Sequence, residues 1–336
     1  MEYRSLSGRR YPLIDKQVGK GGEGRIFEVA DDSRLVAKLY EPAYRTACRE
    51  SKLRAMLQIP LPPELDAQLA WPRDVLYDPM GRPAGFIMRR ICGTPLSALC
   101  ADESLDSARR LTLSKNLCVV FHQIHSSSLV IGDVNGGNVL VSGAGLLNVI
   151  DTDSFHIEHG GRVFRCEVHV PEYLCPAVAN AIPKGESLKT APLPTFTRQS
   201  DEFTLAVLLF QLLMHAHPFS VALAAGNHAE QIPRPSELMR KYAFPYESCP
   251  YGLQLPVYAL PWRLLPERLR FMFIKVFSKG GTIPAARWYE ALCDFERENT
   301  GICKADPRHR YRKGLRKCPY CAAIKRKEAF FKKQRK

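Results

Sequence analysis

Ile131-Gly132-Asp133-Val134-Asn135-Gly136-Gly137-Asn138 is the stretch that decides the fold of this chain, and Asp151 follows it thirteen residues later. The intervening residues read as a short hairpin, with strand-like runs at 139–141 and 147–150 and a Ser-Gly-Ala-Gly turn between them. A hairpin of this length returns the chain to its starting point. We therefore expect two carboxylates and one amide, from Asp133, Asp151 and Asn138, to face one spot.

A glycine-rich run near the N-terminus supplies a second motif. Residues 18–29 contain the pattern G-x-G-x-x-G between strand-like flanks, and its glycines are Gly19, Gly21, Gly22 and Gly24. Where side chains are missing, backbone N–H groups can approach phosphates closely. Such a run by itself is weak evidence for a phosphate-binding site, and other motifs are needed to support it.

A lysine interrupts the apolar strand-like run 35–39, fourteen residues after the last of these glycines. Because a lysine in a buried strand needs an anionic partner, Lys38 is a candidate for binding phosphates. The helix-like run 43–57 follows, and its Glu50 could reach Lys38 and hold it in place. The alternative is that Glu50 is a solvated residue on an exposed helix face, among basic neighbours.

From about Tyr11 to Phe295, the order and spacing of these motifs resemble the eukaryotic-type protein kinase domain. The resemblance implies an α+β, bilobal fold, with residues 1–92 as a small antiparallel β lobe carrying one helix and residues 93–298 as a large helical lobe. In the segment that would join the lobes, Met88 would be the gatekeeper, and the backbone from Arg89 to Ile91 would face the adenine.

The same resemblance implies an ATP-dependent protein kinase, directed at serine or threonine. Lys38 and Glu50 would position the α/β-phosphates under the glycine-rich run. Asn138 and Asp151 would hold Mg²⁺, while Asp133 would orient the substrate hydroxyl and accept its proton.

Departures from the kinase pattern leave an alternative open. Ile131-Gly132 replaces the usual His-Arg, so no arginine adjoins Asp133, and control by activation-loop phosphorylation is not expected. Asn135 stands where many kinases have lysine, and Asp151-Thr152-Asp153 replaces Asp-Phe-Gly. Asp153 is either a further metal ligand or a turn residue. The alternative function is a pseudokinase scaffold that binds nucleotide without transferring phosphate.

The last segment, 299–336, carries a possible metal site. Cys303, His309, Cys318 and Cys321 form C-x5-H-x8-C-x2-C, in which Cys-Pro-Tyr-Cys resembles a knuckle that places two thiolates on one Zn²⁺. A redox motif and ordinary thiols are the alternatives. A structural zinc would contribute on the order of 10 kcal/mol to ordering this small appendage.

Positive charge gathers in this segment. From residue 301 onward, fourteen Lys or Arg residues face two acidic ones, which accounts for twelve of the chain's net charge of +14. One interpretation is a footprint for nucleic acid or an acidic partner, which would make the kinase-like part its regulator. The other is a solvated linker helix from Ala322 onward.

Composition and chain ends suggest a cytoplasmic location. The chain has 336 residues, of which 46% are hydrophobic and 24% charged, enough to bury a large core. No run of eighteen apolar residues occurs, Met1-Glu2-Tyr3-Arg4 begins no signal peptide, and eight of eleven cysteines are scattered as reduced thiols usually are. We therefore expect no membrane association, while the resemblance to protein kinases implies a protein substrate.

The kinase-like core joined to a Cys/His knuckle also resembles a bacterial group found in stress and tellurite-resistance gene clusters. This second resemblance implies a von Willebrand A protein and a metal-dependent phosphatase as partners.

Overall fold

Alternating apolar residues at the start of the chain build an antiparallel sheet that closes on itself. The structure, a computed structural model, describes residues 2–183, 186, 188, 196–224 and 231–334. Six strands follow the order β1-β2-β3-β4-β6-β5, and β1 pairs with β5 to close the barrel. They are β1 (Glu2–Ser5), β2 (Arg10–Lys20), β3 (Gly24–Val29), β4 (Leu35–Tyr40), β5 (Pro72–Tyr77) and β6 (Pro83–Arg89).

One helix, α1 (Ala47–Leu57), packs against this barrel through Leu53 and Met56. The helix is shorter than the predicted run 43–57, because Pro42–Tyr44 form a separate 3-10 turn. Thr46 then caps α1, its hydroxyl accepting the N–H of Arg49 at 3.3 Å. A second short helix, α2 (Pro63–Gln68), leads into β5.

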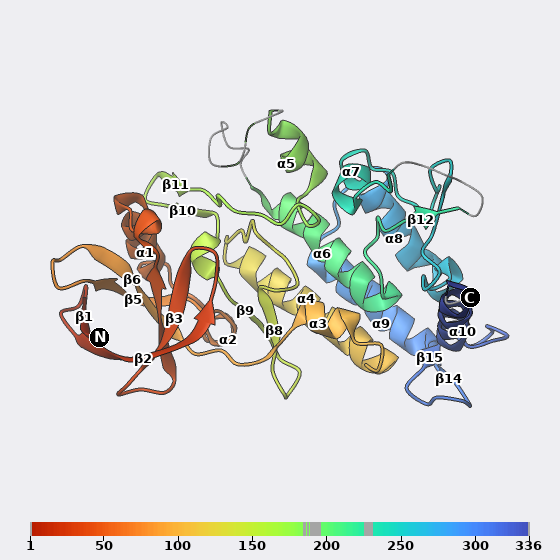
Figure 1. Ribbon diagram of the computed structural model, residues 1–336, viewed down its shortest axis with the longest axis horizontal. Helices are drawn as coiled ribbons and strands as arrows, with labels where there is room; N and C mark the ends of the chain where they lie inside the picture. The colour runs from red at the N-terminus through yellow and green to blue at the C-terminus, as the bar shows by residue number, and fades with distance from the viewer. Residues whose placement is uncertain (1, 184–185, 187, 189–195, 225–230, 335–336) are drawn as a thin grey trace.

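The rest of the chain is mainly helical and lies at the other end of the long axis (Figure 1). Its two central helices, α4 and α6, pack on each other, and α9 packs on α4. The helices here are α3 (Leu96–Ala101), α4 (Ser107–Ser126), α5 (Pro176–Ala181), α6 (Arg198–Met214), α7 (Pro235–Arg240), α8 (Glu267–Phe277), α9 (Ala285–Glu298) and α10 (Pro319–Gln334), with 3-10 turns η2 (Thr152–Ser154) and η3 (Trp262–Leu264).

Short antiparallel strands punctuate this helical part. The central three-stranded sheet, ordered β7-β8-β9, contains the predicted hairpin. Its strands are β7 (Thr94–Pro95), β8 (Val139–Val141) and β9 (Leu147–Val149), and the remaining pairs are β10 (Ile157–His159) with β11 (Arg162–Phe164), β12 (Ala222–Leu223) with β13 (Leu253–Gln254), and β14 (Gly301–Ile302) with β15 (Arg310–Tyr311).

One large apolar core connects the two parts. It runs from Val36 and Met56 beside the barrel, through α4 and α6, to Tyr320 and Ala323 of α10. A smaller core of eight buried residues fills the barrel itself. The α+β class is confirmed; the predicted boundaries at residues 92 and 298 stay predictions.

Candidate functional site

The loop that follows α4 is held in place by an acid of α6. Asp201 accepts the N–H groups of Ile131 at 2.8 Å and Gly132 at 3.0 Å, and its Oδ2 lies 3.2 Å from Nε2 of His125. Gly132 has φ +80°, and a Cβ there would lie 2.6 Å from Cys166, so only glycine fits this turn. The backbone leading into Asp133 is therefore fixed by buried hydrogen bonds.

Two amides shape the loop around Asp133. Asn138 Nδ2 donates to the Asp133 carbonyl oxygen at 3.1 Å and to Oδ2 at 3.4 Å. Asn135 folds the loop instead, because its Oδ1 accepts the N–H groups of Gly137 at 2.9 Å and Asn138 at 3.2 Å. Burial raises the pKa of Asp133, and the negative charge of Asp151 adds to this, while the Asn135 amide opposes it. The structure thus brings Asp133 and Asn138 together, as predicted.

Asp151 reaches the same loop from the end of β9. The N–H of Ile150 donates to the Asn138 carbonyl oxygen at 2.9 Å. Asp151 itself adopts φ 55° and ψ 37°, a conformation uncommon for residues other than glycine and often found at functional sites. Its Oδ1 lies 3.1 Å from Nζ of Lys38. The predicted hairpin therefore brings the chain back beside the loop that carries Asp133 and Asn138.

The main partner of Lys38 is a residue to which the sequence assigned no such role. Lys38 Nζ lies 2.7 Å from Oδ1 of Asp153 and 3.0 Å from Oδ2, and both side chains are buried. The Asp153 carboxylate also accepts the Tyr40 hydroxyl at 2.9 Å. Burial disfavours the charged ammonium, yet the pKa of Lys38 is raised, because the Asp153 and Asp151 carboxylates stabilise the cation.

Glu50 does not hold Lys38 as expected. Its Oε1 accepts hydrogen bonds from the Tyr77 hydroxyl at 2.6 Å and from Arg54 Nε at 2.9 Å. The Tyr77 hydrogen bond in turn lowers the pKa of Glu50. Neighbouring residues on a helix point about 100° apart, so the turn of α1 that directs Arg49 to Asp153 directs Glu50 to β5. Glu50 is therefore bonded to Tyr77 and Arg54, and Lys38 to Asp151 and Asp153. The predicted Lys38–Glu50 ion pair is wrong.

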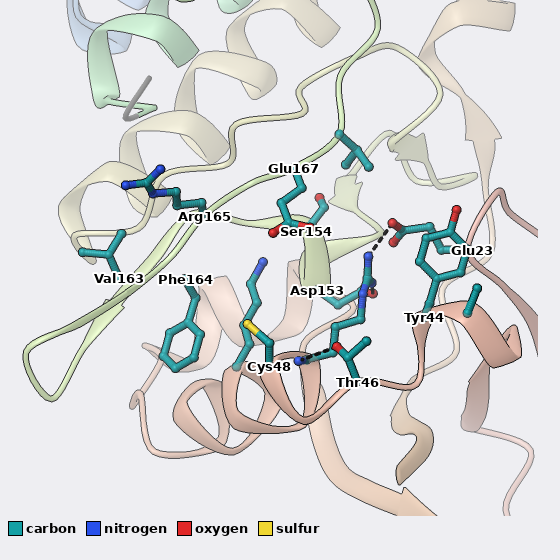
Figure 2. A pocket seen from close by; sticks show the side chains of 14 residues that line it. Glu23, Tyr44, Thr46, Cys48, Asp153, Ser154, Val163, Phe164, Arg165 and Glu167 are labelled. Carbon is teal, nitrogen blue, oxygen red and sulfur yellow. Dashed lines mark hydrogen bonds and ion pairs between the residues drawn. The ribbon is translucent and has the colours of Figure 1, made fainter. Parts of the chain in front are cut away.

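Arg49, the residue before Glu50 on α1, faces Glu23 and Asp153. It forms an ion pair with Glu23 in the glycine-rich turn, and its guanidinium lies 3.8 Å from Asp153 Oδ2. Arg49 lines a cavity of about 530 Å³ between α1 and the β10–β11 hairpin, and Figure 2 shows Glu23 and Asp153 in the same lining.

The glycine-rich run forms the turn between β2 and β3. The N–H of Gly21 donates to the Gly24 carbonyl oxygen at 2.9 Å. A Cβ on Gly24 would lie 2.5 Å from the Leu39 carbonyl oxygen, whereas one on Gly22 would meet no atom within 4 Å, and one on Gly19 would lie 3.2 Å from Ile26. Gly24 is thus required by the sheet, and Gly21 and Gly22 form the open tip of the turn.

The predicted adenine-facing segment follows β6. Met88 is buried in the large core, opposite Val36 of β4. Arg89 is exposed and lies 3.6 Å from Asp66, while Ile91 packs partly buried on the same core. Their roles toward adenine stay predictions.

The four residues predicted to bind zinc converge at the opposite end of the molecule from the barrel, beside β14, β15 and α10 (Figure 1). Their ligand atoms all lie within 4.8 Å of one another. Cys321 Sγ lies 3.6 Å from Cys303 Sγ and 3.5 Å from Nδ1 of His309, and Cys318 Sγ lies 3.7 Å from the same nitrogen. Ligands of a tetrahedral zinc are about 3.4–3.8 Å apart, so these four residues fit the ion.

The basic segment is docked on the body of the protein. Ser107, at the start of α4, donates its N–H to the Arg308 carbonyl oxygen at 3.0 Å. Tyr320 and Ala323 are buried, and Arg326 donates to the Ala259 carbonyl oxygen at 2.7 Å. The helix begins at Pro319, earlier than the linker helix expected from Ala322; its first turn is shielded from solvent, whereas Ile324, Lys325 and Arg326 are exposed.

Comparison with known proteins supports a kinase-like protein. The chain is 29% identical over 340 residues to a protein named Protein kinase YegI from Escherichia coli strain K12. The aligned region covers 92% of this chain and 48% of that protein. The YegI protein of Escherichia coli O157:H7 is 29% identical over 338 residues, with 91% and 48% covered. The chain therefore spans about half the length of the curated relatives it matches. No family model matches it.

In the part of the chain that the structure describes, no helix combines the length and the apolar character needed to cross a bilayer.

Proposed function

We propose that this chain is an ATP-dependent protein kinase that transfers a phosphate to a serine or threonine hydroxyl. The observation that carries the proposal is the convergence of one cation, one amide and two acids. Lys38 contacts Asp151, Asn138 contacts Asp133, and Ile150 joins the two pairs through the Asn138 carbonyl. The names of the similar proteins agree with this chemistry.

Asn138 and Asp151 offer the hard oxygen ligands that Mg²⁺ prefers. Asn138 donates its Nδ2 hydrogens to Asp133, which leaves the amide oxygen as an acceptor. The Asp151 side chain keeps 42% of its surface exposed, so its carboxylate can exchange Lys38 for a ligand. A bound Mg²⁺ would neutralise charge on the phosphates.

Within the proposal, the protein's own residues divide the remaining work. Lys38 binds the α/β-phosphates, and the open turn at Gly21 and Gly22 covers them. Asp133, with its pKa raised chiefly by burial, orients the substrate hydroxyl and accepts its proton. With Gly132 before it, Asp133 has no arginine neighbour that could bind a phosphorylated activation loop. Activity would thus be independent of phosphorylation there.

The test is phosphate incorporation from labelled Mg-ATP into a generic protein substrate. We expect Asp133→Asn to lower kcat by about 10²–10⁴-fold with little change in melting temperature. Asp31→Asn, at an exposed turn after β3, is the matched control and should retain wild-type activity. Equal turnover by wild type and Asp133→Asn would refute the kinase assignment. Nucleotide binding without turnover would identify the pseudokinase alternative.

For the C-terminal segment we propose a structural Zn²⁺ held by Cys303, His309, Cys318 and Cys321. The support is the close approach of four ligand atoms and the filling of all four tetrahedral positions by protein. The redox alternative is less well supported, because Cys318-Pro319-Tyr320-Cys321 leads into α10 beside the antiparallel β14–β15 pair and not into a βαβ unit. The von Willebrand A and phosphatase partners stay predictions from resemblance, the nucleic-acid footprint stays a prediction from charge, and the cytoplasmic location stays a prediction from composition and cysteine usage.

A further inference from the structure

Lys38 sits in a buried ionic network whose geometry differs from the one that the kinase pattern implies. Its exposed side-chain fraction is 7%, and that of Asp153 is 2%. Both oxygens of Asp153 lie within 3.0 Å of Lys38 Nζ, and Oδ2 also accepts the Tyr40 hydroxyl. A buried cation is stable only beside a well-bonded anion, and Asp153 fills that requirement at Lys38.

The two acids that touch Lys38 differ in their freedom to move. Both belong to the turn at η2, where the Thr152 hydroxyl donates to the Ala70 carbonyl oxygen at 2.7 Å and Ser154 N–H bonds the Asp151 carbonyl oxygen at 3.0 Å. The Asp151 side chain is 42% exposed and that of Asp153 is 2% exposed. Asp151 can therefore turn toward a ligand while Asp153 stays on the lysine.

Helix α1 contributes a cation to this network where the kinase pattern expects an acid. Arg49 lies between Glu23 of the glycine-rich turn and Asp153. Its guanidinium also lies 5.1 Å from the centre of the Tyr40 ring. The network therefore runs from the glycine-rich turn through Arg49 and Asp153 to Lys38, and it bypasses Glu50.

We infer that Asp153 is the positioning residue for Lys38, in place of Glu50, and that Arg49 couples this pair to the glycine-rich turn. The inference rests on the proposed function, because it assumes that Lys38 meets nucleotide phosphates. Since Asp151 and Asp153 share one short turn, Lys38 is aligned by the loop that carries the candidate metal ligand. A displacement of α1 would alter the contacts of Arg49 with both Glu23 and Asp153, whereas the direct Lys38–Asp153 hydrogen bonds involve no residue of α1.

The experiment compares Asp153→Asn with Glu50→Gln, two changes that each replace a carboxylate with an amide of the same shape. Mg-ADP affinity is measured by calorimetry, and kcat and KM for ATP are measured on a generic substrate. We expect Asp153→Asn to weaken Mg-ADP binding about 10-fold and to lower kcat about 10-fold or more, because Lys38 loses its fixed position. Glu50→Gln should change each value less than about 3-fold.

A structural role alone would change the melting temperature without this difference in binding and kcat. If Asp153→Asn does not fold, Tyr40→Phe removes one hydrogen bond to Asp153 and should give a smaller loss of the same kind. Equal effects of Asp153→Asn and Glu50→Gln, or wild-type affinity in Asp153→Asn, would overturn the inference. Failure of the proposed function looks different, because wild type itself would then show no turnover, whether or not it binds Mg-ADP.

Discussion

At the scale of single residues, Thr152 occupies the position at which the kinase pattern would place an apolar residue. Its side chain is fully buried, and the hydroxyl donates to the Ala70 carbonyl oxygen at 2.7 Å. Phe155, at the end of the same turn, fills apolar space against Trp71 instead, with ring centres 6.1 Å apart. A hydrogen bond thus anchors the turn that carries Asp151 and Asp153.

Thr152→Val keeps the shape of the side chain and removes this donor. We expect the free energy of unfolding to fall by about 1–3 kcal/mol, because a buried carbonyl loses its partner. Thr112→Val is the control: its hydroxyl bonds the Ala108 carbonyl oxygen on the exposed face of α4, and it should change stability by less than about 0.5 kcal/mol. Denaturant unfolding of both variants measures the difference, and equal losses would contradict this account.

The sequence predicted four residues of the candidate site, but not the contact of Asp153 with Lys38 or that of Arg49 with Asp153. Asp133, Asn138, Asp151 and Lys38 could be found because their positions follow from short loops and one strand. Arg49 was passed over for its neighbour because composition does not reveal how a helix is rotated about its axis. The sequence did hold one clue, because Lys38 and Arg49 are both cations and partly or fully buried cations need acidic partners, which Asp153 and Glu23 provide.

At the scale of elements, the glycine-rich turn separates two uses of glycine. Gly24 lies where β3 and β4 approach each other, and an added Cβ would lie 2.5 Å from the Leu39 carbonyl oxygen. Gly22 lies at the tip, where an added Cβ contacts nothing within 4 Å. Gly24 is therefore needed for the close packing of β3 on β4, whereas Gly22 has open space beside it for a ligand.

Gly24→Ala should therefore lower the melting temperature by several degrees, since about 1–3 kcal/mol of strain corresponds to that shift in a domain of this size. Gly22→Ala should leave the melting temperature of the free protein unchanged within about one degree and raise KM for ATP, because the methyl group would occupy phosphate space. Calorimetry of the two variants with and without Mg-ADP measures the melting temperature of each and the effect of the nucleotide on it. Loss of stability in Gly22→Ala equal to that in Gly24→Ala would refute this division.

The hairpin of β8 and β9 was predicted because its turn and both strands lie within eleven residues. Closure of the barrel was not predicted. It depends on pairing between Arg4 of β1 and Tyr77 of β5, which are far apart in the chain and carry no local pattern that specifies each other. Local elements follow from periodicity, whereas distant pairings follow from packing of the whole sheet.

At the scale of the whole molecule, the Cys/His segment belongs to the body of the protein. The Tyr320 ring stacks on His309 with centres 5.0 Å apart and also lies 5.6 Å from His215 at the end of α6. Tyr320 and Ala323 are members of the large core. The sequence indicated the fourteen basic residues of this segment but did not predict that Tyr320 and Ala323 are buried. Their burial depends on the surfaces of α4 and α6, which lie far away in the sequence.

Because this segment completes the core, zinc should stabilise the whole chain and not only the appendage. We expect one Zn²⁺ per chain in wild type and none in Cys318→Ser, with a lower melting temperature, because the exposed hairpin can no longer hold Tyr320 in place. Cys48→Ser changes an exposed thiol of α1 and should keep both the zinc and the melting temperature. Metal analysis by mass spectrometry and calorimetry measure the two quantities. Zinc-free wild type, or a Cys318→Ser variant that melts like wild type, would show that thiols alone suffice at this end of the molecule.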